Sequence, residues 1–234
     1  MTWTEYWNQG TTIYVNDRHK RVHYEKVAQD VRRLVRDPAA RVVDYGCGEA
    51  ISADQVAAAC GALFLCDSAE TVRQRLAARY ADRNNIDVIG PEVFEALPAG
   101  SIDMIVVNSV VQYLSRAEFS RLLRVWTGKL RPGGQLVLAD VVPPDVGPYA
   151  DAFQLLKFAA ANGFAVAAVV GLVRSYVSGY RQMRDRLGFL QLSEADVLRA
   201  MGEAGLAARR HHPNIGHNAR RMTFVGTLER SVSA

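Results

Sequence analysis

Residues 40–50 read Ala40-Arg41-Val42-Val43-Asp44-Tyr45-Gly46-Cys47-Gly48-Glu49-Ala50, and the rest of the chain is interpreted outward from this segment. A β-branched pair leads into a carboxylate and then into two glycines one residue apart. This pattern predicts a buried strand that ends in a tight turn, because glycine tolerates strained backbone angles and has no Cβ to keep other groups away. In α/β proteins, ligands bind at such strand ends. The segment therefore predicts a ligand site.

The composition is that of an ordinary globular protein. The 234 residues suffice for one full α/β core, and a net charge of +4 is a weak argument for a nucleic-acid partner. Cys47, Cys60 and Cys66 form neither a C-x-x-C pair nor a disulfide framework, and no histidine lies at zinc-ligand spacing from them. We therefore expect a cytoplasmic protein without a bound metal. No apolar run reaches the ~18 residues that a transmembrane segment needs.

Strands and helices alternate over the first two thirds of the chain. Apolar runs predict strands at 41–44, 62–66, 86–89, 102–107 and 135–142, with helices between them. Short connections favour a doubly wound, mostly parallel sheet. Two more strands, 206–211 and 221–228, predict a terminal antiparallel hairpin, which makes seven strands. The expected helix N-caps are Asn16 or Asp17, Ser68, Ser115 and Ser193.

The glycine turn does not match a dinucleotide site well. That site requires G-x-G-x-x-G, and Ile51 stands where the third glycine should be. The Tyr-x-x-x-Lys dyad of short-chain dehydrogenases is also absent from the sequence. An NAD-dependent oxidoreductase therefore remains only an alternative.

Four segments together resemble the class I S-adenosylmethionine-dependent methyltransferases of the small-molecule type: Asp44–Gly48, Leu65-Cys66-Asp67, Ile102-Asp103-Met104-Ile105 and Leu130–Gly134. The resemblance covers about residues 20–142 through motifs and 193–230 through layout. It implies a Rossmann-like methyltransferase fold with a helical insertion or lid. It also implies S-adenosyl-L-methionine as the cofactor.

The resemblance assigns a cofactor site to the strand ends. Gly46 and Gly48 would let the backbone approach the methionine part, and Asp44 would lie near its ammonium group. Asp67 would accept both ribose hydroxyls, although it could instead cap the next helix together with Ser68. Either Glu92 or Val93 would contact the adenine. The full set of cofactor candidates is Asp44, Tyr45, Gly46, Cys47, Gly48, Asp67, Ser68, Glu92, Val93, Asn108 and Ser109.

The acceptor side is less specified. Asn108-Ser109-Val110-Val111 lacks the [DN]-P-P-[FYW] motif of nucleic-acid and amide methyltransferases, so a small-molecule acceptor and no nucleic acid are expected. The candidate acceptor contacts are Tyr14, Gln112, Tyr113 and His211. A histidine can act as general base, and the candidates are His19, His23 and His217. The alternative is that all of these histidines are ordinary surface residues.

The apolar run 158–173 has three interpretations: a buried helix, the wall of a pocket for a lipophilic or aromatic acceptor, or a membrane or dimer contact. We expect one domain over 1–234, made of N-terminal lid helices (1–37), a cofactor-binding core (38–142), a helical acceptor-side insertion (143–192) and a final helix with hairpin (193–230). A catalytically silent module that binds S-adenosylmethionine is the main alternative to an enzyme. Whether the protein forms a homodimer is left open.

Overall fold

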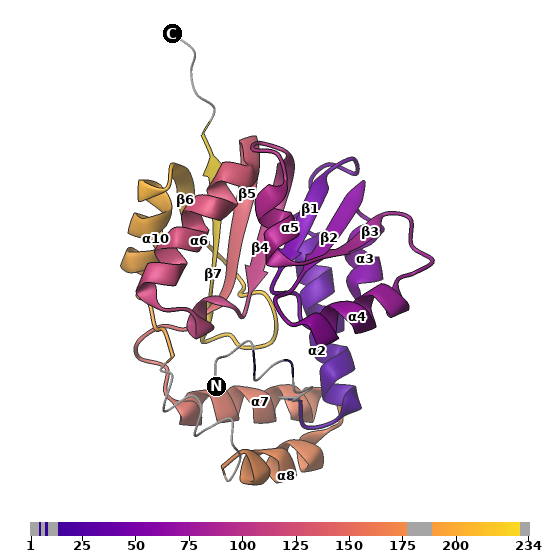
Figure 1. The fold of residues 1–234 in the computed structure, drawn as a ribbon. Coiled ribbons are helices and arrows are strands. Elements are labelled where there is room, and N and C mark those ends of the chain that lie inside the picture. The colour runs from indigo at the N-terminus through magenta and orange to yellow at the C-terminus, as the bar shows by residue number, and fades with distance from the viewer. Residues whose placement is uncertain (1–4, 6–7, 9–13, 177–188, 230–234) are drawn as a thin grey trace.

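A seven-stranded sheet forms the centre of the protein (Figure 1). The computed structural model describes residues 5, 8, 14–176 and 189–229. The strand order is β3-β2-β1-β4-β5-β7-β6, and β7 runs antiparallel to both of its neighbours. The other neighbouring pairs are parallel. The predicted doubly wound sheet with a reversed final strand is confirmed.

The expected strand bounds 62–66, 86–89 and 206–211 are confirmed, and the bounds of the other four strands differ from the expected ones by one to five residues. The strands are β1 Arg41–Tyr45, β2 Ala62–Cys66, β3 Ile86–Ile89, β4 Ile102–Asn108, β5 Leu130–Val141, β6 Leu206–His211 and β7 Met222–Leu228. The helices are α2 Asp17–Arg32, α3 Ala53–Ala57, α4 Glu70–Arg79, α5 Pro91–Ala96, α6 Arg116–Lys129, α7 Pro148–Ala161, α8 Ala165–Tyr176 and α10 Glu194–Glu203, with a 3₁₀ turn, η1, at Val111–Tyr113. β5 starts at Leu130 because that residue already pairs with Ile102.

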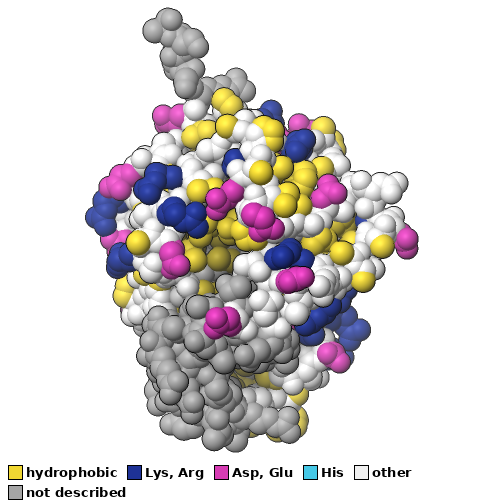
Figure 2. All heavy atoms as spheres, viewed as in Figure 1, with side chains coloured by type: hydrophobic (Ala, Val, Ile, Leu, Met, Phe, Trp, Pro, Cys, Tyr) yellow, Lys and Arg dark blue, Asp and Glu magenta, His cyan; other side chains and the backbone are white. Residues whose placement is uncertain are grey.

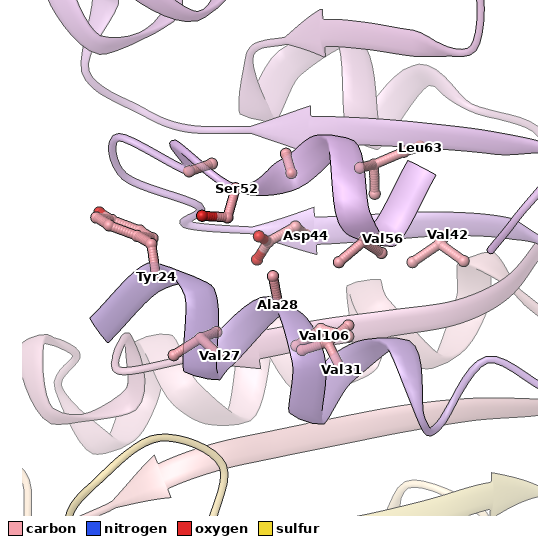
Figure 3. Close-up of a pocket in the computed structure, with 12 residues that line it drawn as sticks. Tyr24, Val27, Ala28, Val31, Val42, Asp44, Ser52, Val56, Leu63 and Val106 are labelled. Carbon is pink, nitrogen blue, oxygen red and sulfur yellow. The ribbon is translucent and has the colours of Figure 1, made fainter. Parts of the chain in front are cut away.

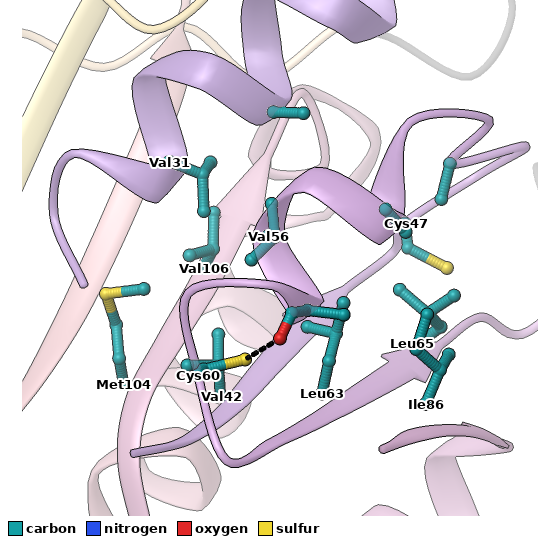
Figure 4. Packing of buried hydrophobic residues seen from close by; sticks show 14 of the residues in the cluster. Val31, Val42, Cys47, Val56, Cys60, Leu63, Leu65, Ile86, Met104 and Val106 are labelled. Atoms are coloured by element: carbon teal, nitrogen blue, oxygen red, sulfur yellow. Dashed lines mark hydrogen bonds between the residues drawn. The ribbon is translucent and has the colours of Figure 1, made fainter. Parts of the chain in front are cut away.

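Both faces of the sheet are buried, as the continuous apolar strands predict. Along β4, Met104 and Val106 face the core under α2, α3 and α4. Ile105 and Val107 face the opposite core, under α5, α6 and α10. Figure 4 shows the first core, where side chains of α2, α3 and the central strands meet around Val106. The strand ends are thereby held on a rigid scaffold.

Three of the expected helix starts are confirmed. Asn16 caps α2, and Ser115 and Ser193 each form a full capping box. The prediction for Ser68 is wrong, since the N-cap of α4 is Ala69. The first-turn N–H of Thr71 donates instead to Asn8 Oδ1 at 3.4 Å, and the Asp67 carboxylate accepts the N–H of Ala69 at 2.8 Å.

Ser115→Ala is expected to lower the free energy of unfolding by about 1 kcal/mol, because the Glu118 N–H loses its acceptor. Urea denaturation measures this change. Ser120→Ala, on an exposed position of the same helix, is the matched control and should be close to neutral. Equal effects of the two substitutions would contradict the role of the cap.

The apolar run 158–173 does not form one buried helix, so that interpretation is wrong. α7 ends at Ala161 and α8 begins at Ala165, with Gly163 at φ +73° between them. Phe158 and Phe164 pack together with buried Ala159 and Ala168, whereas the outer face of α8 is exposed. The two helices lie across the carboxyl-end edge of the sheet (Figure 1).

Within the described part of the chain, no helix is long and apolar enough to cross a membrane. On the face drawn in Figure 2, basic and acidic side chains are interleaved rather than separated into patches of one sign.

Candidate active site

The glycine turn at the end of β1 needs glycine for two reasons. Gly46 and Gly48 have φ of +74° and +58°, in the left-handed region. A Cβ on Gly46 would come within 2.3 Å of Val110 Cγ2, and one on Gly48 within 2.8 Å of the Tyr24 hydroxyl. The backbone of the turn is therefore closely enclosed on both sides.

Asp67, at the end of β2, holds this turn in place. Its Oδ2 accepts the N–H of Gly48 at 2.9 Å, and its Oδ1 accepts the N–H of Ala69. Burial raises the pKa of Asp67, and the two backbone N–H groups oppose that rise. Each carboxylate oxygen keeps a free lone pair, so the group can still accept two hydroxyls.

Helix α2 closes over the turn from the side of the first core. The Tyr24 hydroxyl accepts the N–H of Glu49 at 2.9 Å, and Lys20 Nζ lies 2.9 Å from the Glu49 carboxylate. Tyr24 and Ala28 of α2 also face Asp44 of β1 across a small pocket (Figure 3). Burial, helped by the charge of Asp67, raises the pKa of Asp44 to about 7. A cationic group beside Asp44 would relieve this cost of burial.

The other cofactor candidates are placed differently. The Tyr45 ring packs against Phe94 and Trp126 in the core, so only its backbone faces the edge. Cys47 is buried and Ser68 is exposed. Glu92 and Val93 lie in the first turn of α5, directly after β3, and both are exposed. Their position keeps both open as adenine contacts.

Two strained residues follow at the neighbouring strand ends. Ser109, after β4, and Asp140, in the last residues of β5, both have φ of +58° although neither is glycine. Ser109 Oγ donates to Asp140 Oδ2 at 2.8 Å. Such strain concentrates at functional sites. Asp140 was not among the residues predicted from the sequence, although it lies at the carboxyl end of its strand as Asp44, Asp67 and Asn108 lie at the ends of theirs.

Three of the candidate histidines come together under α7. His19, His23 and His217 have ring centroids 5.7–6.4 Å apart. His19 stacks on Phe164 at 5.0 Å, and His217 stacks on Phe158 at 4.4 Å. Tyr14 contacts the rings of His19 and His23. His211 lies at the end of β6 and has no ring contact with this cluster within the described residues.

The hydrogen bonds of His19 fix its tautomer. Its Nδ1 accepts the N–H of Val15 at 3.3 Å, so the neutral ring carries its proton on Nε2. That Nε2 is buried and has no hydrogen-bond partner in the described part of the chain. In this tautomer His19 can donate a hydrogen bond from Nε2, and its other nitrogen is already occupied by the N–H of Val15. His23 and His217 keep an unpartnered Nδ1 each.

Burial, helped by the neighbouring imidazoles of His217 and His19, lowers the pKa of His23 to about 3. Between pH 6.5 and about pH 3 the unfolded chain binds a proton at His23 that the folded protein does not bind. The free energy of unfolding therefore decreases as the pH falls through this range. Wild type relative to His23→Phe should lose about 2 kcal/mol of unfolding free energy between pH 6.5 and about pH 4.5.

The difference in unfolding free energy between wild type and His23→Phe must be measured, and not the value for wild type alone. The raised pKa of Asp44 increases the stability of both proteins as the pH falls over the same range. Urea denaturation at several pH values gives this difference. His212→Phe, at an exposed histidine, is the control and should show no such trend. A pH-independent difference for His23→Phe would show that its imidazole is not buried as a neutral group.

Unsatisfied polar atoms concentrate at this edge of the sheet. Among the described residues, eight buried side-chain polar atoms lack a hydrogen-bond partner. Six of them belong to His19, His23, Asn108, Gln112, His217 and Arg221. No group of His, Cys, Asp or Glu in the described part is arranged to hold a metal. The edge thus offers hydrogen bonds to a ligand, with carboxylates rather than a phosphate cradle at the glycine turn. This chemistry fits a ligand with an ammonium group and a ribose diol.

Comparisons with known proteins agree with this geometry. Residues 43–138 match the family described as methyltransferase domain. A search of curated protein sequences gave no match. Among solved structures, magnesium protoporphyrin IX methyltransferase from Synechocystis with bound S-adenosylhomocysteine has a TM-score of 0.59 at 16% identity, over 97% of this chain and 93% of that one. The YcgJ protein from Bacillus subtilis has a TM-score of 0.59 at 12% identity, over 88% of this chain and all of the other.

The family match begins in β1 and ends in β5, so it spans the glycine turn, Asp67 and the end of β4. Residues 43–138 therefore form a methyltransferase domain, and its glycine turn and carboxylates are similar to those of the class I S-adenosylmethionine-dependent methyltransferases that the sequence resembles.

Proposed function

We propose that this enzyme methylates a small acceptor that lies over the ends of β4 and β5, beneath α7. The observation that carries the proposal is the cluster of unpartnered buried polar atoms at that edge. Unpartnered buried groups are costly, and a bound ligand would satisfy them. We call the ends of β1, β2 and α5 the cofactor half of this edge and the ends of β4 and β5 the acceptor half. Asn108 lies between the two halves.

The cofactor half is made by β1, β2 and α5. Asp67 would accept the ribose hydroxyls, Asp44 would face the ammonium group, and the backbone at Gly46 and Gly48 would pack against the methionine part. Glu92 or Val93 would contact the adenine. When bound, the cofactor supplies an activated methyl group on a positively charged sulfur. The protein then has to align the acceptor, exclude water and receive a proton where there is one.

The acceptor half has an apolar wall. Phe158 and Phe164 form it together with the rings of His19 and His217, and these contacts favour a lipophilic or aromatic acceptor. Tyr14, Gln112 and Tyr113 would contact the acceptor from the other sides. His19 would donate from Nε2, and His23 or His217 would be the general base among the histidines. His211, on β6, would contact only a larger acceptor.

A transfer assay with a radiolabelled methyl group tests the proposal. The panel should pair lipophilic phenols and arylamines with polar amines and sugars, and His217→Phe should be compared with His212→Phe. We expect transfer to aromatic acceptors, with turnover reduced only by His217→Phe. Transfer only to polar acceptors would contradict the apolar pocket. Tight cofactor binding without transfer to any acceptor would favour the catalytically silent module.

A further inference from the structure

Three adjacent strands bring one carboxylate to the middle of the acceptor half. Asn108 pairs with Ala139, and Val141 pairs with Met222, so Asp140 lies between the end of β4 and the start of β7. The register shifts between Leu138 and Val141. A bulge of this kind re-aims a side chain, and it accompanies the left-handed backbone of Asp140.

The carboxylate is held firmly yet is still open to a ligand. Its Oδ2 accepts from Ser109 Oγ at 2.8 Å, and its Oδ1 accepts from Asn214 Nδ2 at 3.4 Å. The side chain of Asp140 is 22% exposed. An acid that is fixed by neighbours but not fully covered can meet a bound molecule.

The buried guanidinium of Arg221 lies next to the Asp140 carboxylate. Arg221 binds Asp151 of α7 through Nε and Nη2, at 3.2 and 2.7 Å. Its Nη1 lies 4.0 Å from Asp140 Oδ2 and has no hydrogen-bond partner in the described part of the chain, while the side chain is only 9% exposed. Nη1 is thus a second free group beside the Asp140 carboxylate.

The charges favour an acceptor that is neutral. Among the described residues, the groups that act most strongly on Asp140 are the guanidinium of Arg221, the uncharged side chains of Ser109 and Asn214 and the carboxylate of Asp151, and Asp140 in turn acts on the Tyr14 phenol. Two carboxylates against one guanidinium leave a surplus negative charge, which would repel an acceptor carboxylate or phosphate. A hydroxyl or amine could donate to Asp140 instead.

We propose that Asp140 is a catalytic residue that hydrogen-bonds the O–H or N–H of the acceptor and takes its proton during methyl transfer. This inference rests on the proposed function. The acceptor's lone pair forms the new bond to the methyl carbon, and the carbon–sulfur bond breaks with its electron pair left on sulfur. The proton passes to the Asp140 carboxylate and from there to water. Ser109 and Arg221 are positioning residues that fix the carboxylate.

Burial raises the pKa of Asp140, although Arg221, Ser109 and Asn214 oppose the rise. A raised pKa makes the carboxylate a better proton acceptor near neutral pH. His23 and His217, whose pKa values are lowered by burial to about 3 and about 4, are weaker bases by the same reasoning.

The test compares Asp140→Asn with Asp145→Asn, which changes an exposed carboxylate five residues further on. First, calorimetric titration with S-adenosylmethionine checks that both variants fold and bind the cofactor like wild type. Second, fluorine NMR follows the binding of 4-fluorophenol and 4-fluorobenzoate to protein loaded with S-adenosylhomocysteine. Third, turnover is measured on phenol or arylamine acceptors found in the transfer assay.

We expect wild type and Asp145→Asn to bind the phenol and not the benzoate. Asp140→Asn should bind the phenol about tenfold more weakly and lose about 100-fold in kcat, with Asp140→Glu restoring part of the rate. Ser109→Ala, which leaves the carboxylate in place, should give a smaller loss of kcat. Binding of benzoate in preference to phenol, no phenol binding, or unchanged phenol binding in Asp140→Asn would overturn the inference. Failure of wild type to bind S-adenosylmethionine would instead overturn the proposed function.

Discussion

Arg221→Met is expected to lower the free energy of unfolding by about 3–5 kcal/mol. The guanidinium is 9% exposed and is the cation that faces both Asp140 and Asp151. Removing it would leave two half-buried carboxylates without their charge partner. Asp151 lies on α7, so the loss should also loosen this helix from the edge of the sheet.

Urea denaturation of the whole chain measures the change. Arg220→Met is the matched control, because Arg220 is the preceding residue and is exposed. It should shift the free energy of unfolding by no more than about 0.5 kcal/mol. Equal stabilities of the two variants would mean that the Asp140–Arg221–Asp151 contacts contribute little to the fold.

Asp67→Ala is expected to weaken the binding of S-adenosylmethionine by about 100-fold or more. The proposed hydrogen bonds from the ribose hydroxyls to a charged carboxylate are worth about 1.5–3 kcal/mol each. The substitution also removes the acceptor for the N–H of Gly48, which is 2.9 Å from Asp67 Oδ2. The turn would therefore lose its anchor to β2.

Calorimetric titration gives the dissociation constants. Asp87→Ala is the control, because Asp87 is an exposed carboxylate in the next strand of the sheet. It should bind the cofactor as wild type does. An Asp67→Ala protein with unchanged affinity would place the ribose elsewhere on the edge.

The sheet could be predicted from the sequence because each strand carries its own signal. The apolar run Ile102–Val107 is buried on both faces, and such a run is typical of a central parallel strand. The paired Ser115 and Glu118 likewise identify the start of α6. Signals of this kind lie within a few residues and do not depend on tertiary contacts.

The glycine turn and the carboxylate beside it could be located in the sequence for a related reason. Gly46 and Gly48 need their positive φ angles whatever the rest of the chain does, and Asp67 follows a strand that was recognised. Ser68 was misassigned because several side chains compete to accept the backbone N–H groups at the start of a helix. The N–H of Thr71, which a capping Ser68 would accept, donates instead to Asn8 Oδ1, a residue 63 positions away in the sequence.

The acceptor half was harder because its parts come from distant segments. Asp140 and Arg221 are 81 residues apart in the numbering, and only the pairing of β5 with β7 brings them together. The break between α7 and α8 depends on Asn162 and Gly163, which lie inside an otherwise uninterrupted apolar run. The clustering of His19 with His217 follows from the same long-range packing.

The central claim is that the glycine turn and Asp67 bind a methyl donor. Calorimetric titration of the unmodified protein with S-adenosylmethionine, S-adenosylhomocysteine and NAD⁺ tests it most directly. Saturable binding of the two sulfur compounds, with no heat from NAD⁺, is the predicted result. Binding of NAD⁺ without binding of S-adenosylmethionine would contradict it.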